Sequence, residues 1–100
     1  MTARRFNDGL MAFLDASPTP CHATAGMGRI LRAAGFRQLD EAEPWNVGAG
    51  EDCFVVRGDA SLIALRTGNA PLAEDGLRMA GAHTDSPCLK LKPNALRTAS

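Results

Sequence analysis

The fold is decided by the stretch Leu77-Arg78-Met79-Ala80-Gly81-Ala82-His83, which is short, apolar and built largely of small residues. This composition is typical of a strand that is buried on both faces, with its neighbours packed closely over it. The stretch Cys88-Leu89-Lys90-Leu91-Lys92 alternates apolar and charged residues and predicts a half-buried strand that Pro93 ends. A strand buried on both faces requires cover on each side and further strands beside it. We therefore predict an α/β fold in which these 100 residues form the front of a larger domain.

A first helix is predicted upstream, with Thr2 as its cap and an end by Ser17, because Pro18 disfavours helical geometry in the residue before it. Its apolar positions share one helical face, and they are Phe6, Leu10, Phe13 and Leu14.

A second helix is predicted to begin at Pro20, with Thr19 as its cap, and to end at Gly35, with Phe36 packed back on the last turn. Its apolar positions also share one face, and they are Ala23, Met27, Ile30, Leu31 and Ala34. Gly26 and Gly28 cost this helix roughly 1 kcal/mol each relative to alanine, which suggests that a neighbour approaches closely there.

The rest of the predicted sheet comes from an antiparallel hairpin of Asp52–Arg57 and Ser61–Arg66, joined at Gly58-Asp59. Residues 38–50 read as a loop or a further hairpin, and residues 67–76 read as a surface loop. We expect the hairpin and Met79–His83 to lie in one sheet, with 79–83 in its interior and both helices on one face.

Composition excludes several classes of function. The chain has 11 Lys and Arg against 11 Asp and Glu, so its net charge is zero, and it lacks the basic stripe that a nucleic-acid-binding protein needs. No apolar run approaches the ~18 residues of a membrane span, so no membrane partner is expected. The three cysteines (Cys21, Cys53 and Cys88) are odd in number and widely spaced, which predicts reduced thiols in a cytoplasmic protein.

The chemistry concentrates in His83-Thr84-Asp85-Ser86-Pro87, which follows the most buried predicted strand. Open α/β sheets place their ligand sites at the carboxyl ends of strands. His83 and Asp85 are two residues apart and project to the same side of an extended chain, so the carboxylate can orient the imidazole of a metal ligand. A protein metal site needs three or more ligands, so this pair is only part of one. The alternative reading is an ordinary Asp-Ser-Pro turn beside a hydrogen-bonded histidine.

Other reactive side chains have simpler explanations. Cys88 could be a thiolate ligand or nucleophile, but a small apolar residue suffices at the start of a strand. His22 is expected to be a capping or surface residue, and Trp45 to pack as a satellite of the core rather than to bind substrate. The spacing of Lys90 and Lys92 suits protection of a strand edge better than binding of an anion.

A series of short segments runs through most of the chain: Phe13-Leu14, Ser17-Pro18-Thr19-Pro20, His22-Ala23, Ala34-Gly35-Phe36, Leu39, Glu41, Trp45, Ser61-Leu62-Ile63-Ala64 and Ala82 to Pro93. In this order they resemble the N-terminal part of the aspartyl aminopeptidases, a family of two-zinc metallopeptidases. The last block is the longest and the most specific. The resemblance implies a zinc-exopeptidase-type catalytic domain, in which helices pack on a mixed sheet.

The same resemblance implies roles and partners. His83 would be the first zinc ligand and Asp85 the catalytic-site carboxylate that orients it; the other ligands and the general base would lie beyond Ser100. Residues 1–100 would be the N-terminal segment of the catalytic domain, ending near the junction with an inserted second domain. The full-length enzyme would be a homo-oligomer, a dodecamer in the family, with two zinc ions per subunit. It would remove N-terminal residues, Asp or Glu above all, from peptides.

Two alternatives remain open from the residues alone. One is a related two-metal amidohydrolase or deacylase that shares the His-x-Asp strand, and the other is a binding module without catalytic activity. The pattern of carboxylates downstream of residue 100 would distinguish an aminopeptidase from the amidohydrolase or deacylase. We expect the 100-residue chain by itself to be inactive, because His83 is its one credible metal ligand and catalysis with two metals needs several.

Overall fold

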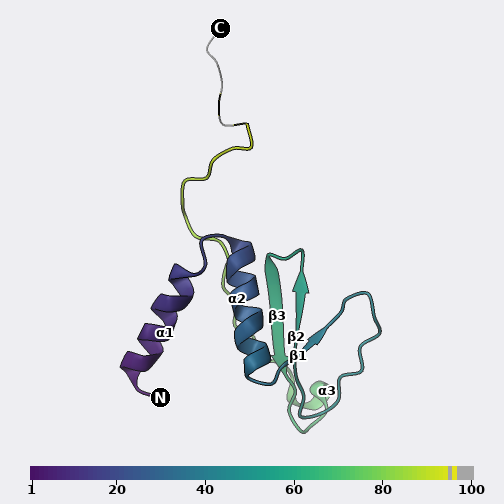
Figure 1. Cartoon of the computed structure of the whole chain (residues 1–100). Coiled ribbons are helices and arrows are strands. Elements are labelled where there is room, and N and C mark those ends of the chain that lie inside the picture. Colours follow the sequence, from purple (N-terminus) through teal and green to yellow (C-terminus); the bar gives the residue numbers. More distant parts are fainter. Residues whose placement is uncertain (95, 97–100) are drawn as a thin grey trace.

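This computed structural model describes residues 1–94 and 96. Its helices and strands are, in chain order, α1 (Ala3–Asp15), α2 (Pro20–Ala33), β1 (Arg37–Leu39), β2 (Asp52–Arg57), β3 (Ser61–Arg66) and α3 (Leu72–Asp75) (Figure 1). The strands form one sheet in the order β1-β2-β3. β1 is parallel to β2, and β2 is antiparallel to β3, so the sheet is mixed. This combination of helices and a mixed sheet confirms the predicted α/β class.

Both long helices begin and end at the predicted signals. The Thr2 hydroxyl accepts a hydrogen bond from the Arg5 N–H at 3.2 Å, and the Thr19 hydroxyl accepts one from the His22 N–H at 3.3 Å. Gly35 ends α2 in the left-handed conformation, with φ of 89°. The amide of the next residue, Phe36, donates to the carbonyl of Leu31 at 2.9 Å, which completes a Schellman cap.

The hairpin of β2 and β3 is also confirmed, with Arg57 opposite Ser61 beside the turn. Gly58 and Asp59 both have positive φ, at 58° and 56°, as a tight hairpin turn requires. β1 was not predicted, because it lies in a segment that reads as a loop or hairpin. Only one of its three residues, Leu39, is buried, so it carries no readable alternation of apolar and polar positions.

The core has two sides, separated by the sheet. Phe54 is fully buried on the side of α2, where its ring lies 3.7 Å from the position of a methyl group at Gly28. Successive strand residues point to opposite faces, so Cys53 and Val55 are buried on the other side together with Leu39. Val47 packs against that second cluster. The loop after β1 therefore covers the face that α2 leaves open, and burial raises the pKa of the Cys53 thiol.

The prediction that both helices lie on the sheet is wrong for α1. Within the described residues, α2 alone contacts the strands, while α1 contacts α2 and stands away from the sheet (Figure 1). Three strands about 4.8 Å apart make a sheet only slightly wider than one helix of about 10 Å diameter, so α2 leaves little room for another. α1 is held by Phe13, whose ring lies 3.2 Å from the position of a methyl group at Gly26.

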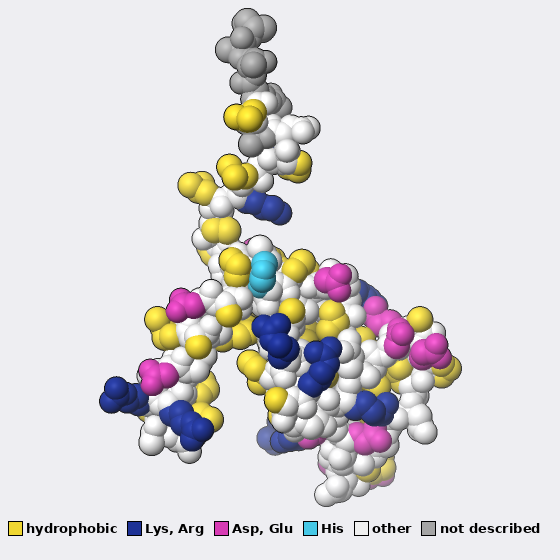
Figure 2. Space-filling view, viewed as in Figure 1, with side chains coloured by type: hydrophobic (Ala, Val, Ile, Leu, Met, Phe, Trp, Pro, Cys, Tyr) yellow, Lys and Arg dark blue, Asp and Glu magenta, His cyan; other side chains and the backbone are white. Residues whose placement is uncertain are grey.

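The predicted strands at 77–83 and 88–92 are wrong in this structure. Both segments lack regular secondary structure, and Leu77 and Met79 are 70% and 89% exposed. Figure 2 shows hydrophobic side chains spread along the C-terminal part of this region, where the chain leaves the body of the molecule. A strand is stabilised by hydrogen bonds to a neighbouring strand, and none of the described residues supplies one here. β3 also has a free outer edge among the described strands, and its Ile63 is 66% exposed.

The segment 67–76, predicted to be a surface loop, contains the one-turn helix α3 at Leu72–Asp75. Gly76 follows with φ of 68°, and its amide donates to the Leu72 carbonyl at 2.8 Å, which ends the turn. All residues of α3 are exposed, in keeping with a surface connection.

The two glycines of α2 are expected to respond differently to alanine. At Gly28 a methyl group would make ordinary contacts, 3.6 Å from the Arg32 side chain and 3.7 Å from Phe54. Gly28→Ala should therefore raise the free energy of unfolding of the full-length protein by about 0.5–1 kcal/mol, through better helix propensity. Gly26→Ala should raise the free energy of unfolding by less, because its methyl group would crowd the Phe13 ring. Urea unfolding checks this order, and a larger gain for Gly26→Ala would contradict the packing described.

Candidate functional site

The candidate site is built on His83, which interacts with a residue two positions along the chain. Its Nδ1 lies 2.7 Å from the Asp85 carbonyl oxygen and 3.1 Å from the Asp85 carboxylate oxygen Oδ1. The second distance falls within the 2.7–3.2 Å range of ordinary hydrogen bonds. The two side chains therefore lie on the same side of the chain, although the segment is not a paired strand.

These contacts decide which ring nitrogen is available. Both partners of Nδ1 are oxygen acceptors, so Nδ1 carries the proton and donates it. The lone pair of the neutral ring is then on Nε2. Histidine ligands of metals are commonly held in this way, with one nitrogen donating to a carboxylate or carbonyl and the other facing the metal. The pair thus has the chemistry of one metal ligand and its supporting carboxylate.

The site is open in the described part of the chain. The side chains of His83 and Asp85 are 77% and 75% exposed. Residues 1–94 and 96 contain no group of three or more His, Cys, Asp or Glu side chains that could hold a metal ion. The pair fits zinc as a single ligand, and a complete zinc site needs further ligands from elsewhere. The metal role of His83 and the supporting role of Asp85 stay predictions.

The other candidate side chains take structural roles or are isolated. The ring of His22 lies 2.7 Å from the Thr19 hydroxyl, which favours the capping role. The Trp45 indole donates to the Asp40 carbonyl at 2.7 Å, at the edge of the fold. Cys88 is an exposed free thiol. Lys90 and Lys92 are exposed on a segment without a strand, so the prediction that they protect a strand edge is wrong here.

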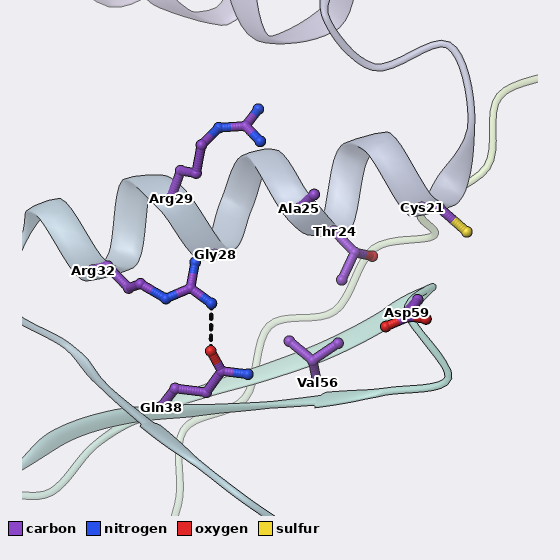
Figure 3. Close-up of a pocket in the computed structure, with 9 residues that line it drawn as sticks. All are labelled: Cys21, Thr24, Ala25, Gly28, Arg29, Arg32, Gln38, Val56 and Asp59. Carbon is purple, nitrogen blue, oxygen red and sulfur yellow. Dashed lines mark hydrogen bonds between the residues drawn. The ribbon is translucent and has the colours of Figure 1, made fainter.

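A pocket of about 340 Å³ between α2 and the sheet was not foreseen. Figure 3 shows Arg32 of α2 pointing toward the sheet, where it donates to the Gln38 side chain of β1. The hydroxyl of Thr24 is buried beside this pocket and has no hydrogen-bond partner among the described residues. The residues that line the pocket come from α2, β1, β2 and the hairpin turn, so no local sequence pattern could have revealed the pocket.

Further ion pairs join the strands of the sheet and the loop after β1. Arg66 of β3 forms two hydrogen bonds to the Asp52 carboxylate of β2, at 2.6 and 2.8 Å. The Arg66 guanidinium lowers the pKa of the Asp52 carboxyl. Arg57 pairs with one carboxylate oxygen of Glu41, Oε1, at 2.7 Å, and this partner raises the pKa of Arg57. These pairs join the strands and the loop after β1, so they serve the scaffold rather than the chemistry.

Comparison with known proteins places the chain among metallopeptidases. Residues 13–100 match the family described as aminopeptidase I zinc metalloprotease (M18). A probable M18 family aminopeptidase 2 from Stutzerimonas stutzeri (strain A1501) is 56% identical over 87 residues, which make up 87% of this chain and 20% of that protein. The protein of the same name from Pseudomonas aeruginosa (strain UCBPP-PA14) is 57% identical over 88 residues, covering 88% of this chain and 20% of the relative.

A chain of one solved structure is also similar to this protein in sequence and in fold. The cryo-EM structure of the Ape4 and Nbr1 complex contains a chain that is 35% identical, with a TM-score of 0.57, over 58% of this chain and 11% of that one. The family match and these relatives define residues 13–100 as a metallopeptidase-type segment. The chain belongs to the M18 aminopeptidase family, whose members are described as zinc metalloproteases, and the predicted resemblance is confirmed. The chain spans about a fifth of the length of the curated relatives that it matches. No helix in the described residues is long and apolar enough to cross a membrane.

Proposed function

We propose that the full-length protein containing this chain is a zinc aminopeptidase that removes N-terminal residues, with a preference for Asp and Glu, from peptides. The observation that carries the proposal is the His83–Asp85 pair, which presents Nε2 of the ring and engages Nδ1 at 2.7 and 3.1 Å. The pair lies within residues 13–100, the segment that matches the zinc metalloprotease family.

The roles of the two residues follow from this geometry. His83 would hold one zinc ion through Nε2. Asp85 accepts a hydrogen bond from the Nδ1–H group, which keeps the ring in one tautomer and makes Nε2 a better electron donor. When bound, zinc, two ions per subunit by our proposal, would supply a Lewis acid for the scissile carbonyl and would lower the pKa of a water molecule held beside it. The remaining ligands and the group that takes the proton of that water would come from the part of the protein beyond residue 100.

The setting of the site is part of the same proposal. Residues 1–100 would be the N-terminal segment of the catalytic domain, ending near an inserted second domain; the end at Ser100 lies outside the described residues. The assembly would be a large homo-oligomer in the cytoplasm. The occurrence of the Ape4 chain in a complex with Nbr1 supports the idea that proteins of this fold assemble with others.

The test measures hydrolysis of arylamides of Asp, Glu, Leu and Ala by the full-length protein. We expect the acidic arylamides to be preferred, activity to disappear on treatment with a chelator, and two equivalents of zinc to restore it. The 100-residue chain, assayed beside it, should give no turnover. Hydrolysis of N-acyl amino acids in place of arylamides would favour the amidohydrolase alternative. Activity that survives complete removal of metal would contradict the proposal.

A further inference from the structure

The segment that carries His83 and Asp85 is attached to the body of the molecule through the residue between them. The Thr84 hydroxyl donates to the Ala60 carbonyl at 2.9 Å, across 24 positions of sequence. Thr84 is also the one residue between 71 and 94 that is not fully on the surface. This hydrogen bond therefore holds the segment against the fold at Thr84, although the residues on both sides of Thr84 are exposed.

The acceptor of this hydrogen bond belongs to a rigid part of the fold. Ala60 follows Gly58 and Asp59, whose left-handed conformations close the hairpin of β2 and β3. The pair Arg57 and Ser61 beside the turn belongs to the ladder of the two strands. β2 supplies three residues of the core, so the Ala60 carbonyl has a fixed position relative to the sheet.

His83, Thr84 and Asp85 differ in how far their side chains are exposed. The side chains of His83 and Asp85 are about three-quarters exposed and meet each other, while Thr84 is partly buried against the hairpin. The chain bends at Thr84, where the Thr84 hydroxyl reaches the hairpin while the side chains of the two residues beside it stay exposed. The anchor is thus one residue from each member of the pair.

We propose that Thr84 is a positioning residue, whose hydrogen bond to the Ala60 carbonyl fixes the His83–Asp85 pair for zinc. This inference rests on the proposed function, in which His83 is a zinc ligand. A ligand that is held in place before the metal arrives loses less conformational freedom on binding than one on a free segment. Removing the Thr84 hydroxyl should therefore weaken zinc binding while leaving the ligand itself intact.

The experiment uses the metal-free full-length protein and measures zinc affinity by competition with a chelator. Thr84→Val keeps the shape of the side chain and removes the hydroxyl, and we expect zinc affinity to fall by about 10–100-fold, as for the loss of other supporting partners. Thr84→Ser restores the hydroxyl and should recover most of the affinity. Melting of each metal-free variant reports its effect on folding.

Thr67→Val is the matched control. Thr67 lies at the opposite end of β3, and its hydroxyl likewise donates to a backbone carbonyl, that of Gly48, at 2.7 Å. The control should lower the melting temperature without lowering zinc affinity. If both valine variants weaken zinc binding equally, the Thr84 effect is one of general stability and the inference is wrong.

His83→Ala separates this inference from the proposed function. If His83→Ala leaves zinc affinity unchanged, His83 is not a ligand and the proposed function fails together with the inference. If His83→Ala abolishes zinc binding but Thr84→Val matches the wild type, the proposed function survives and the positioning role is overturned. Failure of Thr84→Ser to recover affinity would also overturn it, because the hydroxyl would then not be the group that matters.

Discussion

The full-length enzyme carrying His83→Ala is expected to lose bound zinc and to have no measurable aminopeptidase activity. The ring nitrogen Nε2 is the group that would bind the metal, and alanine offers no replacement. Asp85→Asn should have a smaller effect, a loss of about 10–100-fold in metal affinity or activity, because the ring stays in place but loses its charged partner. Zinc content and turnover of purified variants measure both losses.

His22→Ala is the matched control, since the chain contains two histidines. The ring of His22 contacts the Thr19 hydroxyl at the start of α2, so its removal should leave zinc content unchanged. Wild-type zinc content and rate in Asp85→Asn would show that Asp85 is only a turn residue. Wild-type zinc content in His83→Ala would refute the ligand assignment itself.

Phe54→Ala is expected to cause the largest loss of stability among single changes in this segment. Its side chain is fully buried on the face of the sheet that α2 covers, and the Arg32 guanidinium lies 5.5 Å from the ring centroid. Replacement of a buried phenylalanine by alanine costs about 3–5 kcal/mol, because lost burial and a new cavity add together. Denaturant unfolding of the full-length protein measures the change.

Phe54→Leu provides the comparison, because leucine fills part of the same space. Phe54→Leu should lower the free energy of unfolding by less than Phe54→Ala does, since the loss of stability follows the volume of the cavity. Equal losses for the two variants would mean that packing around the ring, rather than cavity size, sets the stability. A loss below about 1 kcal/mol for Phe54→Ala would contradict the buried position described here.

The elements that the sequence predicted well depend on neighbours in the chain. Caps at Thr2 and Thr19, the glycine at position 35 and the Gly58-Asp59 turn each act within a few residues, and each appears in the structure. The His83–Asp85 contact is equally local, and the two side chains meet as their spacing predicts, although the chain bends at Thr84 and forms no strand.

The elements that sequence reasoning missed depend on distant partners. β1 exists because Arg37–Leu39 pairs with residues 53–55, and such a short strand has no pattern of its own. Residues 77–83 have the composition of a buried strand, but strand formation requires a partner that the described residues do not provide. The hydrogen bond from Thr84 to Ala60 joins residues 24 apart, which no motif discloses.

The free outer edge of β3 also bears on how this segment behaves when it is produced alone. An unpaired strand edge offers a row of amide and carbonyl groups to any other extended chain, and the exposed Ile63 adds an apolar contact. Edge-to-edge association of separate copies would then compete with correct folding. Co-translational protection by a chaperone, or a lysine in place of Ile63, would suppress such aggregation during expression.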